Sequence, residues 1–288
     1  MRLHRIGDTV DRLGESCVWS VEEAALWWID VRGPSLRRLD AAAGRIDSFD
    51  LPETVGSIGL RAGGGLVVAL GSRIAVFDPA SGRLDTIARP HETYDNQRFN
   101  DGRCDRQGRF WSGTMDDVAR GECGTLYRLE ADRSLAPVLG PVTIPNSLAW
   151  SPDGATMYFS DTTSRAIMAY DFDTASGTPS RPRVFARTEG PGTPDGSTVD
   201  CEGFLWNAEY DGWRLTRYAP DGRVDRIVPM PIARPTCCAF GGPDLATLYV
   251  TTAAQKLTAA ELAAQPLAGG LLALDAGVRG LPEPCYAG

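Results

Sequence analysis

Residues 151–177 read SPDGATMYFSDTTSRAIMAYDFDTASG, and this segment contains the unit that decides the fold. A turn with Asp153 and Gly154 comes first, followed by a run of apolar and aromatic residues (MYFSD), a polar interval, a second β-like run (IMAYDFD) and a turn that ends at Gly177. Asp-Gly pairs are typical of tight β-hairpin turns, and short aromatic or aliphatic runs between turn residues indicate strands. The segment therefore predicts short strands joined by tight turns.

The same unit recurs along the chain with a nearly constant period. Further copies occupy residues 22–44, 62–82, 105–132, 200–222 and, more loosely, 241–275. One apolar residue anchors each unit, and these anchors are Leu26, Leu66, Phe110, Met157, Leu205 and Leu248. Successive anchors lie 40, 44, 47, 48 and 43 residues apart, which is the length of a propeller blade. We therefore predict an all-β fold, a six-bladed β-propeller of four-stranded antiparallel blades, in which residues 1–288 form a single domain.

The pattern inside each unit suggests which strand lies nearest the centre of the ring. The first run is densely apolar, as in LWWID at residues 26–30, and predicts an inner strand that is buried on both faces. The second run alternates more and predicts an outer strand. Thr258 and Glu261 form a T-x-x-E capping box before an alanine-rich stretch that Pro266 ends, so we expect one short helix inserted in the last blade.

Charge and hydropathy exclude several classes of partner. The chain has a net charge of −8 and a pI near 4.9, so it would repel a phosphate backbone, and we expect no nucleic-acid partner. No apolar stretch approaches the roughly 20 residues that span a bilayer, so we expect no membrane helix and no membrane partner. The first twenty residues lack the apolar core of a secretory signal, which favours a cytoplasmic location. The sequence makes no prediction of oligomeric state.

The residue inventory also limits the chemistry. The chain has only two histidines, and its seven cysteines form no C-x-x-C pair, so neither a histidine-rich zinc site nor a zinc ribbon is indicated. No G-x-S-x-G, H-E-x-x-H or P-loop motif occurs. The cysteines are interpreted as reduced thiols, mostly buried. What remains is chemistry based on carboxylates, side-chain amides and an arginine.

Polar residues recur at one phase of the repeat. Glu15, Asn100, Asn146 and Asp195 each lie ten or eleven residues before the anchor of a unit. Equivalent positions of different blades converge near the axis of a propeller, so these oxygens could form one hard site for Ca²⁺, Mg²⁺ or Mn²⁺, with Fe²⁺ or Zn²⁺ tolerated. Each residue also has an ordinary alternative, because Glu15, Asn146 and Asp195 could occupy turns and Arg98 could be a surface charge. The shared phase favours the joint site.

At these residues the sequence resembles the senescence marker protein/gluconolactonase family, the regucalcin-like sugar lactonases. The resemblance runs from residue 13 to residue 274, and its most specific parts are R-F-N-D-G at residues 98–102 with G-T-M at 113–115, and P-D-G-x-x-x-D-x-x-G-x-L-W at 194–206. It implies a six-bladed propeller, in agreement with the repeat. Further matching stretches are LGES (13–16), IPNSLAWSPDG (144–154), PTCCAFGGPDLATLYVTTA (235–253) and PLAGGLLAL (266–274).

The resemblance also implies roles for particular residues. It makes Glu15, Asn146 and Asp195 the ligands of one divalent metal ion, and Asp195 the candidate general base. It makes Arg98 and Asn100 the residues that hold substrate oxygens. A metal ion polarises a lactone carbonyl and lowers the pKa of water, and a nearby carboxylate can accept the proton, so the assignment is chemically coherent.

Two positions depart from the family pattern. The family has Gly-Pro after the first glutamate, where this chain has Ser16 and Cys17, and it has glycine after the metal-site asparagine, where this chain has Ser147. Both changes alter backbone freedom beside a candidate ligand, although neither removes a ligand oxygen. Cys17 is interpreted as a buried thiol rather than as a metal ligand.

The expected function is a hydrolase that opens a sugar-acid lactone to the free aldonic acid in carbohydrate catabolism. Its partner would be a small-molecule sugar lactone, and its cofactor one divalent ion among Ca²⁺, Zn²⁺, Mn²⁺, Mg²⁺ and Fe²⁺. Two alternatives stay open at this point. The same metal site could hydrolyse an organophosphate or another ester, or the protein could be a calcium-binding propeller without turnover.

Overall fold

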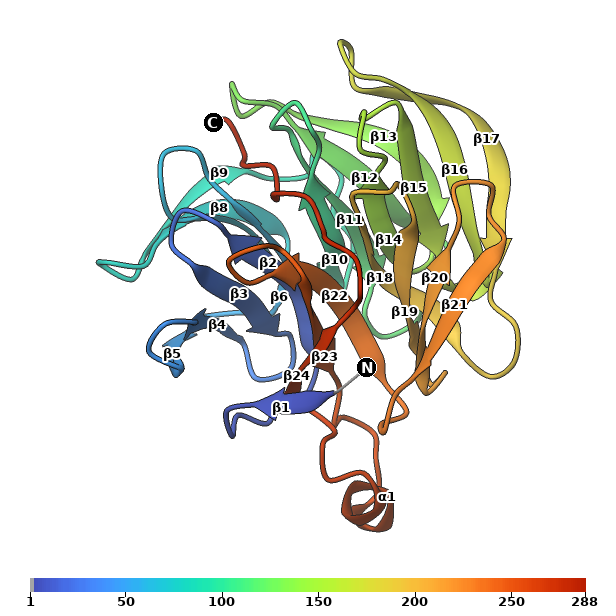
Figure 1. The fold of residues 1–288 in the computed structure, drawn as a ribbon. Coiled ribbons are helices and arrows are strands. Elements are labelled where there is room, and N and C mark those ends of the chain that lie inside the picture. Colours follow the sequence, from blue (N-terminus) through green and yellow to red (C-terminus); the bar gives the residue numbers. More distant parts are fainter. Residues whose placement is uncertain (1–2) are drawn as a thin grey trace.

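Six four-stranded antiparallel sheets account for nearly all of the regular structure in the computed structural model, which describes residues 3–288 (Figure 1). The sheets are arranged as blades around a common centre, and strands that are neighbours in a blade are neighbours in the chain except where the ring closes. The predicted six-bladed β-propeller of four-stranded antiparallel blades is confirmed.

In blades I to V the chain runs from the innermost strand outward, one strand after another. Blades I and II contain β2 (Gly14–Ser20), β3 (Ala25–Asp30), β4 (Ser35–Asp40), β5 (Arg45–Asp50), and β6 (Val55–Leu60), β7 (Leu66–Leu70), β8 (Arg73–Asp78), β9 (Arg83–Ala88). Blades III and IV contain β10 (Gln97–Cys104), β11 (Phe110–Asp116), β12 (Gly124–Leu129), β13 (Leu135–Val142), and β14 (Pro145–Trp150), β15 (Thr156–Asp161), β16 (Ala166–Asp173), β17 (Thr178–Arg187). Blades V and VI contain β18 (Thr193–Val199), β19 (Leu205–Tyr210), β20 (Arg214–Tyr218), β21 (Val224–Pro229), and β22 (Pro235–Gly241), β23 (Thr247–Thr252), β24 (Leu271–Asp275), β1 (His4–Ile6).

Blade VI closes the ring by combining both ends of the chain. Its three inner strands come from the C-terminal part, and β1 pairs antiparallel with β24 as the outermost strand, with Arg5 opposite Leu272. The sequence predicts no strand at this position, because a run of three residues is too short to show a strand pattern. This pairing joins the N-terminal strand of the chain to blade VI and covers the outer edge of β24.

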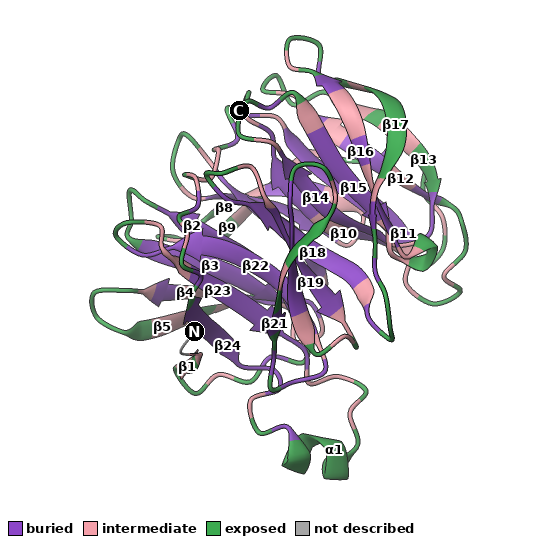
Figure 2. Ribbon diagram, turned by 45° about the vertical axis from the view of Figure 1, so that its right-hand side comes forward, coloured by how far each residue is buried: buried purple, intermediate pink, exposed green. Residues whose placement is uncertain are grey.

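The centre of the ring is formed by the first strand of each blade. β2, β6, β10, β14, β18 and β22 contact one another in sequence around the axis, and β14 and β22 are buried along their whole length (purple in Figure 2). The densely apolar runs form the second strands instead, since the LWWID run belongs to β3. The predicted burial of this run is confirmed, but the run forms the second strand of its blade and not the strand at the axis. Large side chains fill the space between neighbouring blades, whereas small and polar residues fit at the crowded axis.

Two blades use an aspartate to fix the hairpin between their first and second strands. Asp105 accepts hydrogen bonds from the backbone N–H groups of Gln107 (2.9 Å) and Arg109 (3.0 Å), and from the buried indole Nε1–H of Trp111 (3.0 Å). Asp200 makes the corresponding bonds in blade V, including one from the indole of Trp206 at 2.9 Å. The spacing D-x-x-G-x-x-W thus couples a tight turn to a fully buried aromatic ring.

The predicted short helix is confirmed in the last blade. α1 (Ala259–Ala264) begins after Thr258, whose hydroxyl accepts a hydrogen bond from the backbone N–H of Glu261, while the Glu261 carboxylate accepts one from the N–H of Thr258. α1 projects from the blades and has no buried residue (Figure 2). A single 3₁₀ turn, η1 (Thr162–Ser164), follows β15. Within residues 3–288, neither helix is long or apolar enough to cross a membrane.

Candidate functional site

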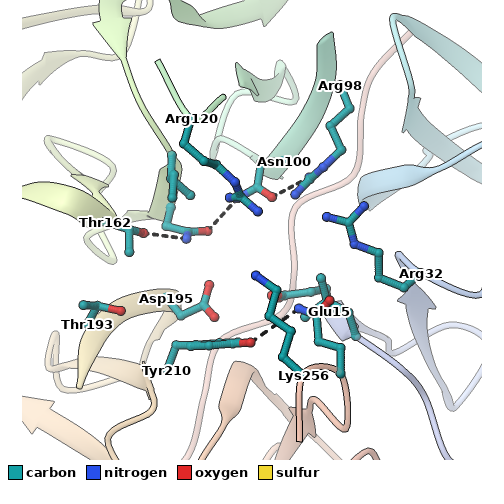
Figure 3. A pocket seen from close by; sticks show the side chains of 14 residues that line it. Glu15, Arg32, Arg98, Asn100, Arg120, Thr162, Thr193, Asp195, Tyr210 and Lys256 are labelled. Atoms are coloured by element: carbon teal, nitrogen blue, oxygen red, sulfur yellow. Dashed lines mark hydrogen bonds between the residues drawn. The ribbon is translucent and has the colours of Figure 1, made fainter. Parts of the chain in front are cut away.

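A cavity of about 280 Å³ lies near the axis, where the first strands of the blades begin and the second strands end (Figure 3). Its size is at the small end of the range for ligand pockets and suits a molecule of monosaccharide size. All five residues singled out from the sequence contribute to its wall. The lining comprises Leu13, Glu15, Arg32, Arg98, Asn100, Arg120, Ile144, Asn146, Thr162, Thr193, Asp195, Tyr210, Gln255 and Lys256.

A register shift at the start of each first strand positions these side chains. On β2, the step from Glu15 to Val18 covers three residues, whereas the facing step on β3 covers two. β10, β14 and β18 show the same irregularity, beginning at Phe99, Asn146 and Pro194 respectively. A β-bulge of this kind bends the strand and redirects a side chain. Its repetition explains why residues of equal phase converge on one cavity.

The two serines that depart from the family pattern lie in these bulges. Ser16 has φ +50° and Ser147 has φ +58°, a left-handed conformation that glycine adopts more readily. The hydroxyl group of each serine forms a hydrogen bond to the neighbouring blade, which offsets the cost of this backbone conformation. Ser16 Oγ accepts a hydrogen bond from the N–H of Ile58 (3.0 Å), and Ser147 Oγ donates one to the carbonyl of Asp195 (2.7 Å). The departures therefore add contacts between neighbouring blades beside the candidate ligands.

Cys17, the other departure, does not line the cavity. Its side chain is fully buried in an apolar cluster that includes Trp19, Trp28 and Cys237, and it is not part of the cavity wall. The interpretation as a buried thiol is confirmed.

A chain of hydrogen bonds connects three blades across the site. Arg98 Nη1 donates to Asn100 Oδ1 at 2.7 Å, and Asn100 Nδ2 donates to Asn146 Oδ1 at 3.1 Å. Asn146 Nδ2 donates to Thr162 Oγ1 at 2.7 Å, and that hydroxyl donates to the carbonyl of Pro194 at 2.9 Å. Because each amide has both its donor and its acceptor engaged, the orientation of both asparagines is fixed.

Asp117 holds the arginines on one side of the cavity. Arg32 donates to both of its carboxylate oxygens at 2.5 and 2.7 Å, and Arg98 Nε donates to Oδ1 at 2.7 Å. Burial alone would raise the pKa of Asp117, but the hydrogen bonds from Arg32 and the charge of Arg98 outweigh it and lower the pKa to about 2. Asp117 was not identified from the sequence, and it is the residue that gives Arg98 a fixed direction.

Replacing Asp117 with asparagine is expected to destabilise the protein at neutral pH and not in strong acid. The low pKa means that the stabilising contribution of Asp117 is complete above the ordinary aspartate value of 3.8 and is lost as pH falls through about 2. Urea unfolding of the wild type and of Asp117→Asn should therefore differ by about 1–2 kcal/mol at pH 7, and by progressively less between pH 4 and pH 2.

The exposed ion pair between Asp85 and Arg83 provides a control for this titration. Such surface pairs contribute little, so Asp85→Asn should change the free energy of unfolding by less than about 1 kcal/mol at every pH. A difference between wild type and Asp117→Asn that stays constant from pH 7 to pH 2 would contradict the role of the Asp117 charge.

The opposite side of the site contains carboxylates without a cationic partner. Burial, the charge of Asp195 and further negative groups raise the pKa of Glu15 well above its usual range, while burial and the charge of Asp101 raise that of Asp195. Burial also raises the pKa of Asp101 to about 6, although the N–H of Leu148, the charge of Arg103 and the N–H of Gly102 oppose the shift. In the part of the chain that the structure describes, no Arg, Lys or His nitrogen lies within 4.0 Å of these three carboxylates. Uncompensated negative charge is costly to bury, so this arrangement suits a bound cation.

The donor chemistry fits a hard divalent ion. Glu15 and Asp195 offer carboxylate oxygens, and Asn146 offers a carboxamide oxygen that has one lone pair left beside its bond to Asn100. Residues 3–288 contain no group of three or more His, Cys, Asp or Glu placed to hold a metal ion, and this set differs from such a group because its third donor is an amide. The set of two carboxylates and one carboxamide is therefore the candidate for a metal centre.

Comparison with known proteins identifies the family to which this arrangement belongs. Residues 13–254 match the family described as the SMP-30/Gluconolactonase/LRE-like region. The chain belongs to this family. The matched region includes β2 through β23 and thus contains every strand that contributes to the cavity wall.

Members of the SMP-30/gluconolactonase/LRE-like family resemble this chain over nearly its whole length. A protein from Pseudomonas putida named 6-deoxy-6-sulfogluconolactonase is 42% identical over 96% of this chain and 95% of its own. A protein from Azospirillum brasilense named L-arabinolactonase is 38% identical over 98% of this chain and 95% of its own. Among solved structures, a calcium-binding protein, regucalcin, from Agrobacterium tumefaciens superposes with a TM-score of 0.93 at 31% identity, covering 98% of this chain and 96% of its own.

The sequence did not indicate several residues that form this site. They share a second phase, since each is the last residue of a second strand or follows it within four residues. Second strands run antiparallel to first strands, so their ends return to the face where the first strands begin. The sequence pattern covered only positions ten or eleven residues before the apolar anchor of each unit, whereas these residues come after the anchor. The missed residues are Arg32, Asp117, Arg120, Thr162, Tyr210, Gln255 and Lys256.

Proposed function

We propose that this protein is a metal-dependent hydrolase that opens a sugar-acid lactone to the free aldonic acid in carbohydrate catabolism. The observation that carries the proposal is the pairing of two features in one small cavity. Carboxylates without cationic partners lie on one side, and the fixed Arg98–Asn100 pair lies on another. The names of the Pseudomonas and Azospirillum relatives support lactone hydrolysis.

Glu15, Asn146 and Asp195 would hold the divalent ion, which when bound supplies the positive charge that polarises a carbonyl oxygen. Oxygen ligands admit Ca²⁺, Zn²⁺, Mn²⁺, Mg²⁺ or Fe²⁺, and the description of the Agrobacterium protein as calcium-binding supports Ca²⁺ as the first ion to test.

The remaining chemistry belongs to the side chains of this protein. Asp195 accepts a proton from the attacking water as the water oxygen bonds to the lactone carbonyl carbon. The bond from that carbon to the ring oxygen then breaks, and the ring oxygen takes the proton back from Asp195 and becomes a hydroxyl. The carboxylic acid formed in this way releases its proton to the solvent and becomes a carboxylate. Arg98 and Asn100 orient the substrate oxygens, because both side chains are held by other residues of the site.

The test is hydrolysis of a panel of aldonolactones at constant pH by metal-stripped protein, with Ca²⁺, Mg²⁺, Mn²⁺, Zn²⁺ and Fe²⁺ restored one at a time. Spontaneous opening of each lactone is subtracted. We expect one or two lactones to be opened at least about 100-fold faster when the correct ion is present. Saturable binding of an ion without acceleration of any lactone would overturn the proposal in favour of a calcium-binding role.

A further inference from the structure

The cavity wall carries four basic side chains, Arg32, Arg98, Arg120 and Lys256. They come from blades I, III and VI, and Figure 3 shows the Arg32, Arg120 and Lys256 side chains extending toward the cavity from different directions. Lys256 is the only lysine in a chain that otherwise uses arginine for its basic positions. A neutral sugar lactone needs hydrogen-bond partners but no such excess of positive charge.

Little negative charge is available to neutralise these groups. Asp117 is the one carboxylate, among residues 3–288, that forms ion pairs with any of the three arginines. Its pairing with Arg32 and Arg98 is close, but Arg120 reaches it only at 3.8 Å. Lys256 forms no ion pair with any described residue. Glu15 and Asp195 belong to the candidate metal site. Positive charge on Arg120 and Lys256 is therefore left to face the cavity.

Both of these residues also have an uncommon backbone conformation. Arg120 has φ +56° and Lys256 has φ +59°, in loops that follow the second strands of their blades. Glycine and asparagine adopt this left-handed conformation more readily than a long side chain does. Arg133, Arg165 and Arg181 adopt the same conformation outside the cavity, so the assignment of Arg120 and Lys256 depends on their place in the cavity wall and on their lack of a close ion pair.

We propose that the substrate is an aldonolactone that carries an anionic group on the carbon farthest from the lactone carbonyl, and that Arg120 and Lys256 bind this group. The group is a sulfonate, a phosphate or a carboxylate, which share acceptor oxygens and negative charge. This inference rests on the proposed lactonase function and specifies its substrate class. Arg98 and Asn100 then contact the sugar oxygens, while Arg120 and Lys256 bind the anionic group at the far end of the lactone.

Discrimination by charge would be strong in this setting. The protein as a whole has a net charge of −8, so its general field repels an anionic sugar, and attraction must come from local groups. A site built to pair a charged group also rejects the analogue without it, because the cations are then left unpaired within a small cavity.

The first experiment compares kcat/KM of the metal-loaded enzyme for glucono-1,5-lactone and for its counterparts with a sulfonate, phosphate or carboxylate at carbon 6. We expect at least one charged lactone to exceed the neutral one by about tenfold or more, with the advantage shrinking as salt is added. The charged lactone with the highest kcat/KM identifies the anionic group. Equal values for neutral and charged lactones would overturn the proposal.

Asparagine variants test the two residues, because asparagine suits their backbone conformation and removes the charge. Arg120→Asn and Lys256→Asn should each lower kcat/KM for the charged lactone about tenfold and reduce its advantage over the neutral one. Arg45→Asn, on the outer strand β5, removes a charge of the same sign from a side chain that is 65% exposed, and should leave the ratio unchanged. A loss of equal size for neutral and charged lactones in the Arg120 and Lys256 variants would overturn their assignment.

Binding of a compound that cannot be hydrolysed separates this inference from the lactonase proposal. 1,5-Anhydroglucitol and its 6-phosphate have the ring without the lactone carbonyl, and calorimetry measures their affinity for the metal-loaded protein. If no lactone is hydrolysed, the proposed function fails, yet tenfold tighter binding of the phosphate would still support an anion site. Equal affinity for the two compounds would overturn it.

Discussion

Replacing Asp195 with alanine is expected to lower kcat for lactone hydrolysis by about 1,000-fold or more. The carboxylate would hold the divalent ion and also accept the proton of the attacking water, and proton transfer alone contributes about 100- to 10,000-fold. Asp195 is buried, faces the cavity, and lies in the bulge at the start of β18. Initial rates at saturating lactone and a fixed concentration of the activating ion measure the effect.

An asparagine variant separates the two roles of Asp195. Asp195→Asn keeps an oxygen that can face the metal ion but cannot accept a proton, so it should retain measurable metal binding while losing most of kcat. Asp85→Asn removes an exposed carboxylate from the outer strand β9 and serves as the control, with unchanged kcat. Full activity of Asp195→Ala would show that the site is wrongly assigned.

The sequence was most informative where one local rule repeats. The recurring unit predicts six blades because every blade must contain the same four strands and turns, and the capping box of Thr258 and Glu261 predicts α1 because both of its hydrogen bonds are local. The candidate site follows from the common phase of Glu15, Asn146 and Asp195 for the same reason. Each residue lies near the start of a first strand, and the ring brings those starts together.

The sequence was less informative where long-range packing decides. The innermost strands have small and polar residues, so hydrophobicity alone favours the second strands as the inner ones, and the ring closure by β1 depends on a partner more than 260 residues away. Asp117 and Lys256 lie in loops of unequal length, and only the fold shows that both loops reach the site. Their roles come from contacts between blades that no local pattern contains.

Replacing Asp200 with alanine is expected to destabilise the protein by about 3–5 kcal/mol. Asp200 is fully buried and accepts hydrogen bonds from Trp206 Nε1 at 2.9 Å and from Arg217 Nε at 2.9 Å. It also accepts bonds from two backbone N–H groups of the turn that follows. Alanine leaves these donors without that acceptor and removes one partner of a buried ion pair. Urea and thermal unfolding measure the loss, which should lower the melting temperature by about 10 °C.

Asp221 provides a matched control in the same blade, because it accepts a backbone hydrogen bond in a comparable turn but is exposed. Asp221→Ala should cost less than about 1 kcal/mol. An unfolding midpoint of Asp200→Ala equal to that of Asp221→Ala would contradict the structural role of Asp200.

Asp195 and Asp200 lie near opposite ends of β18, about 15 Å apart in an extended strand. The folded fraction of Asp200→Ala should therefore keep its kcat, while Asp195→Ala should lose activity without the stability loss of Asp200→Ala.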